Sequence, residues 1–146
     1  MVSVRKAITD DIDNIINFLS SMGYSNQEIY KDKDYFVYYE NNSLLGCGTA
    51  YSIKEYCIID DIFVDVDHRR NKIGTALVKT ILNFYEVKGV KIAFVSDSCR
   101  EFWESLGFTV YMWDKLPDLI KDITDLNRST NSLFYVNLEG YFKDCC

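Results

Sequence analysis

The sequence is poor in proline and histidine and has no long apolar run. One proline and seven glycines in 146 residues are too few for a linker or a disordered chain. No apolar stretch is long enough to cross a bilayer, and the first residues carry neither the apolar core nor the cleavage site of a secretion signal. We therefore expect a cytoplasmic protein that does not bind a membrane.

The residues that are present fit a folded, acidic domain. Apolar residues make up 48% of the chain and aromatic residues 15%, and a chain of this length buries roughly two-thirds of its unfolded surface. We expect a single domain over residues 1–146. Acidic residues outnumber basic ones by 22 to 16, so the surface should repel nucleic acid and favour cationic partners.

The sequence offers no convincing disulfide or metal site. Its five cysteines are an odd number without CxxC spacing, so reduced thiols are the preferred interpretation. Cys145-Cys146 could bind a soft metal or oxidise, but a frayed tail is favoured. Asp65-Val66-Asp67 spells a DxD motif, yet hard cations need more oxygen ligands than the sequence brings together. We expect no metal.

Apolar periodicity divides the chain into strands and helices. We expect strands over residues 2–8, 35–39, 44–53, 56–64, 91–96, 108–113 and 132–138. We expect helices over residues 10–22, 26–31, 73–87, 98–106 and 117–126. This order implies an α/β (α+β) fold with a mixed, mostly antiparallel sheet of about six to seven strands and helices on both faces. Gly46 and Gly48 indicate a bulge or a close backbone approach in the third strand.

Short polar residues mark the ends of several elements. Thr9 offers an N-cap for the first helix, and Asp97 or Ser98 offers one for the helix that follows. Asn41-Asn42 supplies turn chemistry between two aromatic, β-branched segments, which predicts a hairpin.

The most informative stretch runs from Ile58 to Leu77. An apolar β-type segment leads into a turn that contains Arg69, Arg70 and Lys72, and then into an amphipathic helix. An anion at the first turn of a helix meets N–H groups that have no partner within the helix, at the positive end of the helix dipole. The pattern therefore predicts a site for a phosphorylated cofactor.

Three segments of this chain carry motifs in a set order. Residues 69–74, RRNKIG, match a turn written Q/R-x-x-G-x-G/A at its first and last positions. Residues 62–64, IFV, match the strand before that turn, and residues 102–108, FWESLGF, match a later F-Y-x-x-L-G-F helix end. Together with the element order, they resemble the GNAT superfamily of acyl-CoA-dependent N-acetyltransferases over nearly the whole chain.

The resemblance implies a GNAT-like fold and acetyl-CoA as co-substrate. Backbone donors of the basic turn would hold the coenzyme diphosphate, and backbone groups near Phe63 and Val64 would pair with the pantetheine arm as an extra strand. The implied coenzyme-binding residues are Ile62, Phe63, Val64, Arg69, Arg70, Asn71, Lys72, Ile73, Gly74 and Thr75.

Two residues depart from the family pattern. Lys72 stands where the family usually has glycine, so the turn must avoid a positive φ there or accept a strain of about 1–3 kcal/mol. Trp103 replaces a tyrosine that protonates the departing thiolate in many members, and an indole cannot do this. We expect Trp103 to fill the core beneath its helix. The remaining sources of a hydroxyl are Ser96, Ser98 and Tyr111.

Two acids come just before the Ile-Phe-Val strand. Asp60 and Asp61 are similar to the Glu-Asp pair of the diamine acetyltransferases, which implies a catalytic role in binding an ammonium ion and taking its proton. Because adjacent strand residues face opposite sides, only one of them can point into the cleft. A hydrated or ion-paired edge is an equally good interpretation. Glu55 is a third candidate, and His68, which has no plausible partner at catalytic spacing, is expected to be a surface residue.

The sequence thus predicts an N-acetyltransferase (EC 2.3.1.-) that moves an acetyl group from acetyl-CoA to a primary amine by direct attack in a ternary complex. The acceptor is a small cationic amine or polyamine, or a lysine or N-terminal amine. Two alternatives stay open. One is an acyl-CoA-binding sensor or interaction module with little catalysis, which Trp103 motivates; the other is a metal-dependent glycosyl or phosphoryl transferase that uses the DxD acids. The aromatic-rich last strand is compatible with a homodimer.

Overall fold

The computed structural model describes residues 1–24, 32–69, 72–126 and 131–142. The strands are β1 (Val2–Lys6), β2 (Asp34–Glu40), β3 (Ser43–Ile53), β4 (Tyr56–Val64), β5 (Ile92–Asp97), β6 (Thr109–Val110) and β7 (Ser132–Asn137). The helices are α1 (Ile12–Ser21), α2 (Ile73–Val87) and α3 (Arg100–Ser105), with short 3₁₀ helices η1 (Thr9–Asp11), η2 (Val66–His68) and η3 (Trp113–Lys115). β4 and α2 have the predicted bounds. The helical piece expected at 26–31 lies outside the described residues.

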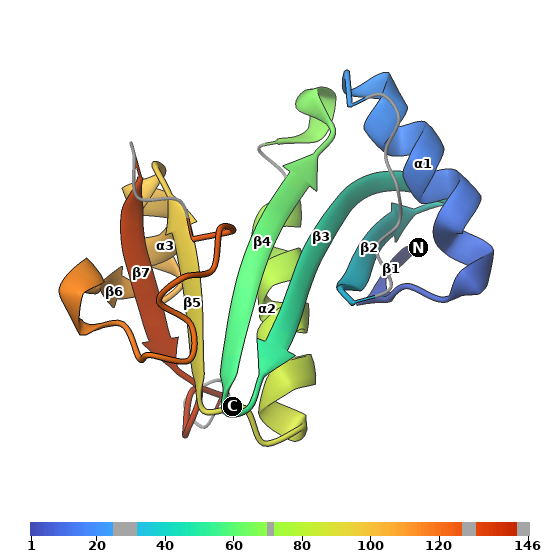
Figure 1. Ribbon diagram of the computed structural model, residues 1–146. Helices are drawn as coiled ribbons and strands as arrows, with labels where there is room; N and C mark the ends of the chain where they lie inside the picture. Colours follow the sequence, from blue (N-terminus) through green and yellow to red (C-terminus); the bar gives the residue numbers. More distant parts are fainter. Residues whose placement is uncertain (25–31, 70–71, 127–130, 143–146) are drawn as a thin grey trace. The chain divides into compact units, whose positions relative to one another are not determined.

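The strands form a seven-stranded sheet in the order β1-β2-β3-β4-β5-β7-β6 (Figure 1). β4 and β5 run parallel, whereas the β1–β2, β2–β3, β5–β7 and β6–β7 pairs are antiparallel. The prediction of a mixed, mostly antiparallel sheet is therefore confirmed. β7 lies between β5 and β6, so it is not the outer strand to which a second copy would add.

The described chain divides into two compact units. The first comprises Met1–Ala50 and Asp61–Ile81, and the second comprises Tyr51–Asp60 and Leu82–Cys146. β3, β4 and α2 each begin in one unit and end in the other. The candidate coenzyme residues all belong to the first unit.

In the first unit, α1 packs on one face of β2 and β3. The buried residues of this cluster are Ile15, Phe18, Leu19, Tyr35, Val37 and Cys47. Phe18 and Leu19 lie three and four positions after Ile15 on α1, so the three side chains share one face of the helix. α1 ends as predicted before Gly23, which has a φ of +93°.

α2 packs on the opposite face of β3. A Cβ placed on Gly46 would lie only 2.8 Å from Cγ2 of Ile73. One placed on Gly48 would lie 3.0 Å from Cδ1 of Ile81. Cys47, between the two glycines, points toward α1, so β3 has no side chains where α2 approaches. The predicted close backbone approach is confirmed, and the helices of this unit lie on both faces of its strands.

The hairpin between β2 and β3 turns at Asn41-Asn42, as predicted. Their φ angles of +50° and +70° lie in the left-handed region that a two-residue hairpin turn requires. Beyond the turn, the register shifts between Tyr38 and Tyr39, which leaves Leu45 as the extra residue of a bulge. The C=O of Leu45 accepts the N–H of Asp65 at 2.9 Å, and this bond ties the residue after β4 to β3.

The second unit has a separate core around β5 and β7. Its buried residues are Ile58, Phe94, Leu116, Ile120, Leu126 and Leu133. The predicted helix over 117–126 is wrong, because this segment is a series of turns. Ile120, Ile123 and Leu126 each donate their N–H to the residue three positions earlier. The apolar spacing of three and four residues is real, but i→i+3 turns bury it as well as an α-helix would.

α3 and β6 are shorter than predicted. α3 begins after Cys99, and no side chain caps it, so the expected cap by Asp97 or Ser98 is wrong. β6 contains two residues, and the chain then turns into η3 instead of continuing as a strand to residue 113. After Tyr111, whose N–H donates to the C=O of Leu133, the N–H groups of Lys115 and Leu116 donate to residues three positions earlier, so local turns replace the strand.

No helix among the described residues combines the length and the apolar character needed to cross a membrane. The cytoplasmic location and the single domain over residues 1–146 stay predictions.

Candidate functional site

The turn from β4 to α2 is built on Asp65. Its carboxylate accepts the N–H of Asp67 at 3.1 Å and so caps η2. Nε of Arg69 then donates to the C=O of Val64 at 3.4 Å, which folds the basic side chain back over the end of β4. Arg70 and Asn71, which we predict to be coenzyme residues, lie outside the described residues.

Lys72 is the last residue before α2 and has a φ of +60°. Its C=O accepts the N–H of Ala76 at 3.1 Å, which is the first bond of the helix. The turn therefore does not avoid a positive φ at Lys72, and the backbone there carries the strain. A residue with a Cβ costs about 1–2 kcal/mol in this region.

The first turn of α2 presents the N–H groups of Ile73, Gly74 and Thr75. N–H groups at the start of a helix have no acceptor four residues back, and the 15-residue helix adds the positive end of its dipole. Ile73 is buried, while Gly74 and Thr75 are half-buried. This end of α2 therefore has the donors that a phosphate group needs, and the exposed Lys72 comes immediately before it in the chain.

The end of β4 leads directly into this turn. The β4–β5 ladder runs from the Tyr56–Ile92 pair to the Ile59–Val95 pair, whereas β4 itself continues to Val64. Residues 62–64 therefore extend beyond the ladder. Their backbone has the extended geometry that a strand-like ligand would need for main-chain pairing.

Asp60 and Asp61 differ in exposure. The side chain of Asp61 is exposed and that of Asp60 is half-buried. The N–H of Asp61 donates to Oγ1 of the buried Thr49 at 3.2 Å. Burial, reinforced by the charge of Asp61, raises the pKa of the Cys47 thiol to about 12. The Asp61 carboxylate thus puts a negative potential on the α1 face of β3.

Trp103 is a core residue, as expected. It is 3% exposed, and its ring makes edge-to-face contacts with Phe102 and Phe108. Nε1 donates to the Asp97 carboxylate at 2.7 Å, which fixes the indole against the end of β5. At this position the chain therefore has no phenol hydroxyl that could take the role of the family tyrosine.

The other hydroxyl candidates are not equivalent. Tyr111 packs its ring against Phe94 and Tyr135, and its O–H donates weakly to the C=O of Lys115 at 3.3 Å. Ser98 is exposed and Ser96 is half-buried. Tyr111 therefore belongs to the core of the second unit, and the two serines are the more accessible hydroxyls.

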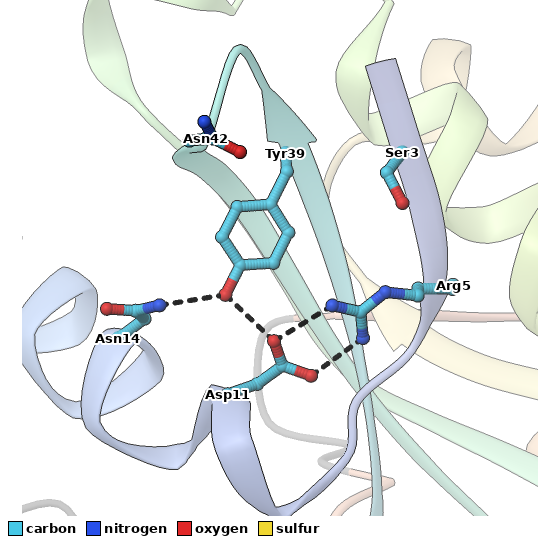
Figure 2. A pocket seen from close by; sticks show the side chains of 6 residues that line it. All are labelled: Ser3, Arg5, Asp11, Asn14, Tyr39 and Asn42. Atoms are coloured by element: carbon cyan, nitrogen blue, oxygen red, sulfur yellow. Dashed lines mark hydrogen bonds and ion pairs between the residues drawn. The ribbon is translucent and has the colours of Figure 1, made fainter. Parts of the chain in front are cut away.

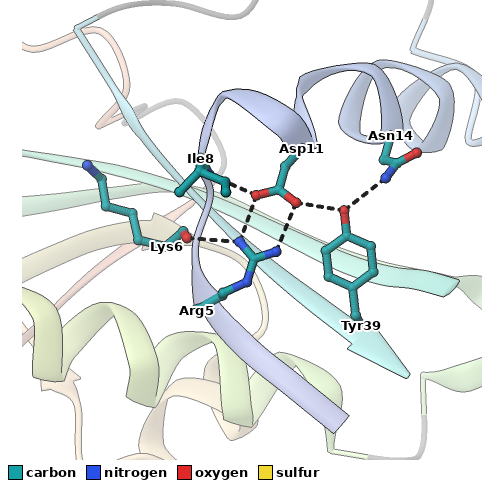
Figure 3. Close-up of polar contacts among 6 residues, drawn as sticks. All are labelled: Arg5, Lys6, Ile8, Asp11, Asn14 and Tyr39. Carbon is teal, nitrogen blue, oxygen red and sulfur yellow. Dashed lines mark hydrogen bonds and ion pairs between the residues drawn. The ribbon is translucent and has the colours of Figure 1, made fainter. Parts of the chain in front are cut away.

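A polar network between β1, α1 and β2 was missed by the sequence analysis. Nη1 and Nη2 of Arg5 donate to the two carboxylate oxygens of Asp11, at 2.7 and 3.0 Å (Figure 2). The carboxylate also accepts the N–H of Ile8 at 2.8 Å and the O–H of Tyr39 at 2.9 Å (Figure 3). Asn14 donates in turn to the Tyr39 oxygen at 3.1 Å. Four donors thus converge on one side chain.

The network holds β1, α1 and β2 together. Asp11 is 4% exposed, and the hydrogen bonds from Arg5 lower its pKa to about 2 against the opposing effect of burial. A cavity of about 380 Å³ lies beside it, lined by Ser3, Arg5, Asp11, Asn14, Tyr39 and Asn42. Thr9 lies inside η1, whose N-cap is Ile8, and no side chain caps α1, so the predicted N-cap by Thr9 is wrong. The available signal was an arginine at the end of a strand six residues before the acid.

The family comparison agrees with the geometry of the turn. The model of the Acetyltransferase (GNAT) family matches residues 9–108, a range that contains β4, the basic turn and α2. The chain belongs to the GNAT acetyltransferase family. The resemblance seen in the sequence is therefore confirmed, and the chain is an acyltransferase.

Solved GNAT structures share the fold at low sequence identity. A GNAT acetyltransferase from Staphylococcus aureus has a TM-score of 0.71 and 15% identity, covering 94% of this chain and 99% of that one. The ribosomal-protein-S18-alanine N-acetyltransferase of Escherichia coli has 0.68 and 16%, covering 94% of each chain. The PaiA N-acetyltransferase of Thermoplasma acidophilum, solved with coenzyme A, has 0.68 and 12%, covering 94% and 99%.

No curated protein matches the chain. The GNAT structures show the fold of the chain. The local likeness to diamine acetyltransferases stays a prediction.

Proposed function

We propose that this GNAT family member transfers the acetyl group of acetyl-CoA to a primary amine by direct attack in a ternary complex. The observation that carries the proposal is the basic turn that ends at the open first turn of α2, immediately after β4. A diphosphate there would meet the N–H groups at the start of a helix and nearby cationic side chains. The same fold in a protein solved with coenzyme A supports this coenzyme.

The proposed coenzyme site has two parts. The diphosphate is held by the turn and the helix start, and the pantetheine arm pairs with the backbone of residues 62–64, which lies beyond the β4–β5 ladder. The residues concerned are Ile62, Phe63, Val64, Arg69, Arg70, Asn71, Lys72, Ile73, Gly74 and Thr75. Main-chain pairing of the arm would fix the thioester carbonyl for attack.

The acceptor half of the proposal rests on Asp60 and Asp61. The amine must be neutral when its nitrogen attacks the thioester carbon, so a carboxylate first binds the ammonium ion and takes its proton, directly or through water. The new N–C bond then forms as the C–S bond breaks, the nitrogen gives its second proton to water or to the departing thiolate, and coenzyme A leaves. Asp61, which is exposed, is more accessible to an incoming amine than the half-buried Asp60.

The coenzyme thiolate can leave without a general acid, but at a cost in rate. A thiol with a cysteine-like pKa of about 8.5 leaves without a general acid, whose aid is typically worth about 10²–10⁴-fold. Because Trp103 cannot donate a proton to the thiolate, we expect turnover to be slow compared with family members that carry the tyrosine. Ser96 and Ser98 are the remaining groups that could position a water.

A single assay separates this function from its rival, a coenzyme-binding module without catalysis. Purified protein is mixed with acetyl-CoA and a panel of polyamines, lysine peptides and amino acids, and release of free thiol is followed. Saturable thiol release with one class of amine supports the transferase. Saturable acetyl-CoA binding with no turnover on any acceptor supports the module. Absence of acetyl-CoA binding rules out both the transferase and the module.

Replacing the two acids one at a time tests the acceptor site. We expect Asp61→Asn to lower kcat by about 100-fold, because it removes the base while it keeps the shape of the side chain. The matched variant Asp60→Asn should lower kcat by less than about threefold. Adjacent strand residues face opposite sides, so Asp60 should point away from the cleft if Asp61 points into it. The reverse ranking would assign the base to Asp60, and unchanged kcat in both would refute the role of these acids.

Substitutions at Lys72 separate the effect of backbone strain on stability from the effect of the side-chain charge on coenzyme affinity. Lys72→Gly removes both the Cβ and the ammonium group, so we expect the free energy of unfolding to rise by about 1 kcal/mol and coenzyme affinity to fall by about threefold to tenfold. Lys72→Ala is the control, because it removes the charge and keeps the Cβ. It should show the same loss of affinity without the gain in stability, as measured by urea unfolding and calorimetry.

A further inference from the structure

The polar network between β1, α1 and β2 borders an open cavity in the first unit. The cavity has a volume of about 380 Å³ and is lined by Ser3, Arg5, Asp11, Asn14, Tyr39 and Asn42. None of these residues is among those proposed to bind the coenzyme. Small-molecule sites in proteins have volumes of about 300–1,000 Å³, so this cavity is large enough for a small organic molecule.

The strand register explains why these side chains meet. Ser3 and Arg5 are two positions apart on β1, so they share one face of the strand. Ser3 pairs with Tyr39 of β2, whose ring packs against the core cluster of α1. Asn14 comes from α1, and Asn42 comes from the turn between β2 and β3. The walls of the cavity therefore belong to elements that the network already holds together.

The acid in this cavity is not available to a ligand. The carboxylate of Asp11 accepts two hydrogen bonds from Arg5, one from the N–H of Ile8 and one from the O–H of Tyr39. A carboxylate has about four acceptor positions, so these donors occupy all of them. A cation would have to displace one of the donors. The cavity therefore does not select a cation, although it contains an acid.

The guanidinium group of Arg5, in contrast, keeps one edge open. Nη1 and Nη2 each direct one N–H to Asp11, and Nη1 directs its other N–H to the C=O of Lys6 at 3.2 Å. Nε–H and the second N–H of Nη2 have no acceptor among the residues that the structure describes. In Figure 2, Ser3 and Asn42 lie on the side of the guanidinium group that faces away from Asp11. The Arg5 side chain is 40% exposed, so a ligand can reach this edge from solvent.

We propose that this cavity binds the carboxylate of a small organic acid on the Nε–Nη2 edge of Arg5, with Ser3 and Asn42 as further hydrogen-bonding partners. Two parallel N–H groups of a guanidinium match the two oxygens of a carboxylate. The hydroxyl of Ser3 and the amide of Asn42 can bind a carboxylate oxygen or a second polar group of the ligand. The site goes beyond the proposed acetyl transfer and does not depend on it.

Arg5 is held in place before any ligand arrives. Asp11 binds one edge of the guanidinium group, and Cζ lies 5.6 Å from the centre of the Tyr39 ring, within the range of a cation–π contact. A side chain that is already ordered loses little further freedom on binding. Because Asp11 shares the charge of Arg5, a singly charged carboxylate is favoured over a doubly charged phosphate, which Asp11 would repel more strongly.

The experiment is an NMR titration of the full chain with sodium lactate at constant ionic strength. The arginine Nε–H signals and the backbone amide signals are followed. We expect one Nε–H signal to shift and to saturate with a dissociation constant of about 1–10 mM, together with the amides of residues 3, 5 and 42. Lactamide, which has the same shape without the charge, should not produce this shift. Inorganic phosphate should bind at least about threefold more weakly than lactate.

Three variants locate the site. Arg5→Lys keeps a cation for Asp11 but has no second N–H edge, so lactate affinity, read from the backbone amides, should fall by at least about tenfold. Asn42→Gly removes the amide and suits the φ of +70°, so the hairpin is kept and affinity should fall by about threefold. Arg100→Lys is the matched control, because Arg100 pairs with Glu104 in the second unit. It should bind lactate as the wild type does.

The outcomes are distinct. A saturable shift that lactamide does not reproduce, and that weakens in Arg5→Lys and Asn42→Gly, supports the proposal. Absence of a saturable shift up to about 100 mM lactate overturns it, as does equal affinity in the wild type and Arg5→Lys or tighter binding of phosphate than of lactate. If Arg5→Lys does not fold, equal affinity in the wild type and Asn42→Gly overturns it. The acetyltransferase proposal is tested separately, by thiol release from acetyl-CoA.

Discussion

Gly46→Val is expected to destabilise the protein by about 3 kcal/mol and to weaken coenzyme binding by at least about tenfold. A Cβ at this position would lie 2.8 Å from Cγ2 of Ile73, 2.9 Å from Cδ1 of Leu77 and 3.3 Å from the C=O of Phe63. Ile73 begins α2, and Phe63 belongs to the strand proposed for the pantetheine arm. A branched side chain at Gly46 would therefore push apart the two elements that the coenzyme has to bridge.

Gly48→Ala is the matched control. Its Cβ would meet Cδ1 of Ile62 and of Ile81 at 3.0 Å, and these are terminal methyl groups that can turn aside. We expect a loss of stability below about 1.5 kcal/mol and unchanged coenzyme affinity. Urea unfolding and calorimetric titration of both variants measure the two effects. If Gly46→Val bound the coenzyme as tightly as Gly48→Ala does, the diphosphate would not depend on the start of α2.

Arg5→Met should be the most damaging change in the polar network, with a loss of about 3 kcal/mol in the free energy of unfolding at neutral pH. It leaves Asp11, which is 4% exposed, with the hydrogen bonds of Ile8 and Tyr39 but without its counter-ion. Removing one partner of a buried ion pair costs about 3–5 kcal/mol, and the 40% exposure of the Arg5 side chain places this pair at the lower end. Chemical denaturation measures the loss directly.

The network also predicts how stability depends on pH. The pKa of Asp11 is lowered in the folded protein to about 2, so its contribution is fully present above the unfolded pKa of about 4 and is lost as the pH falls to about 2. The linked free energy is about 2 kcal/mol. We expect the stability difference between wild type and Arg5→Met to shrink over this window, because a protonated Asp11 needs no counter-ion.

Asp11→Asn provides the control. It removes the charge but keeps an oxygen that can accept the Ile8 N–H, so its stability should change little between about pH 4 and 2 on account of this site. A wild-type protein that loses no more stability over this window than Asp11→Asn would show that the pair is not formed in solution.

The sequence predicts elements well where local signals agree. β4 and α2 have the predicted bounds because each apolar pattern stops at a marked turn, and Gly89, with a φ of +91°, ends α2. The prediction of a helix over 117–126 is wrong for the opposite reason. Its buried residues repeat at spacings that suit both an α-helix and a chain of i→i+3 turns, and the bond from Tyr51 to Asp125 at 2.7 Å is invisible to a local pattern.

The same limit applies to the candidate site. The basic turn was identifiable because strand, turn and helix are contiguous in the sequence. Asp11 was not, because Asp10, Asp11 and Asp13 look alike until Arg5 selects one of them. Nδ1 of His68 lies 3.5 Å from a carboxylate oxygen of Asp65, but an acid three residues away is common on solvated turns and carries no specific signal.

The position of β7 between β5 and β6 has a consequence for how the chain is made. Each of the six residues of β5 has a partner in β7, and the two residues of β6 pair with β7 as well. A chain that emerges from the ribosome has made β5 and β6 long before it reaches residue 132. Until β7 has been made, the outer row of hydrogen-bonding groups on β5 has no partner, so the second unit can complete its folding only after residues 132–137 have been synthesised. Nascent chains stalled before residue 132 should bind chaperones or be cleaved by proteases more readily than chains that already contain β7.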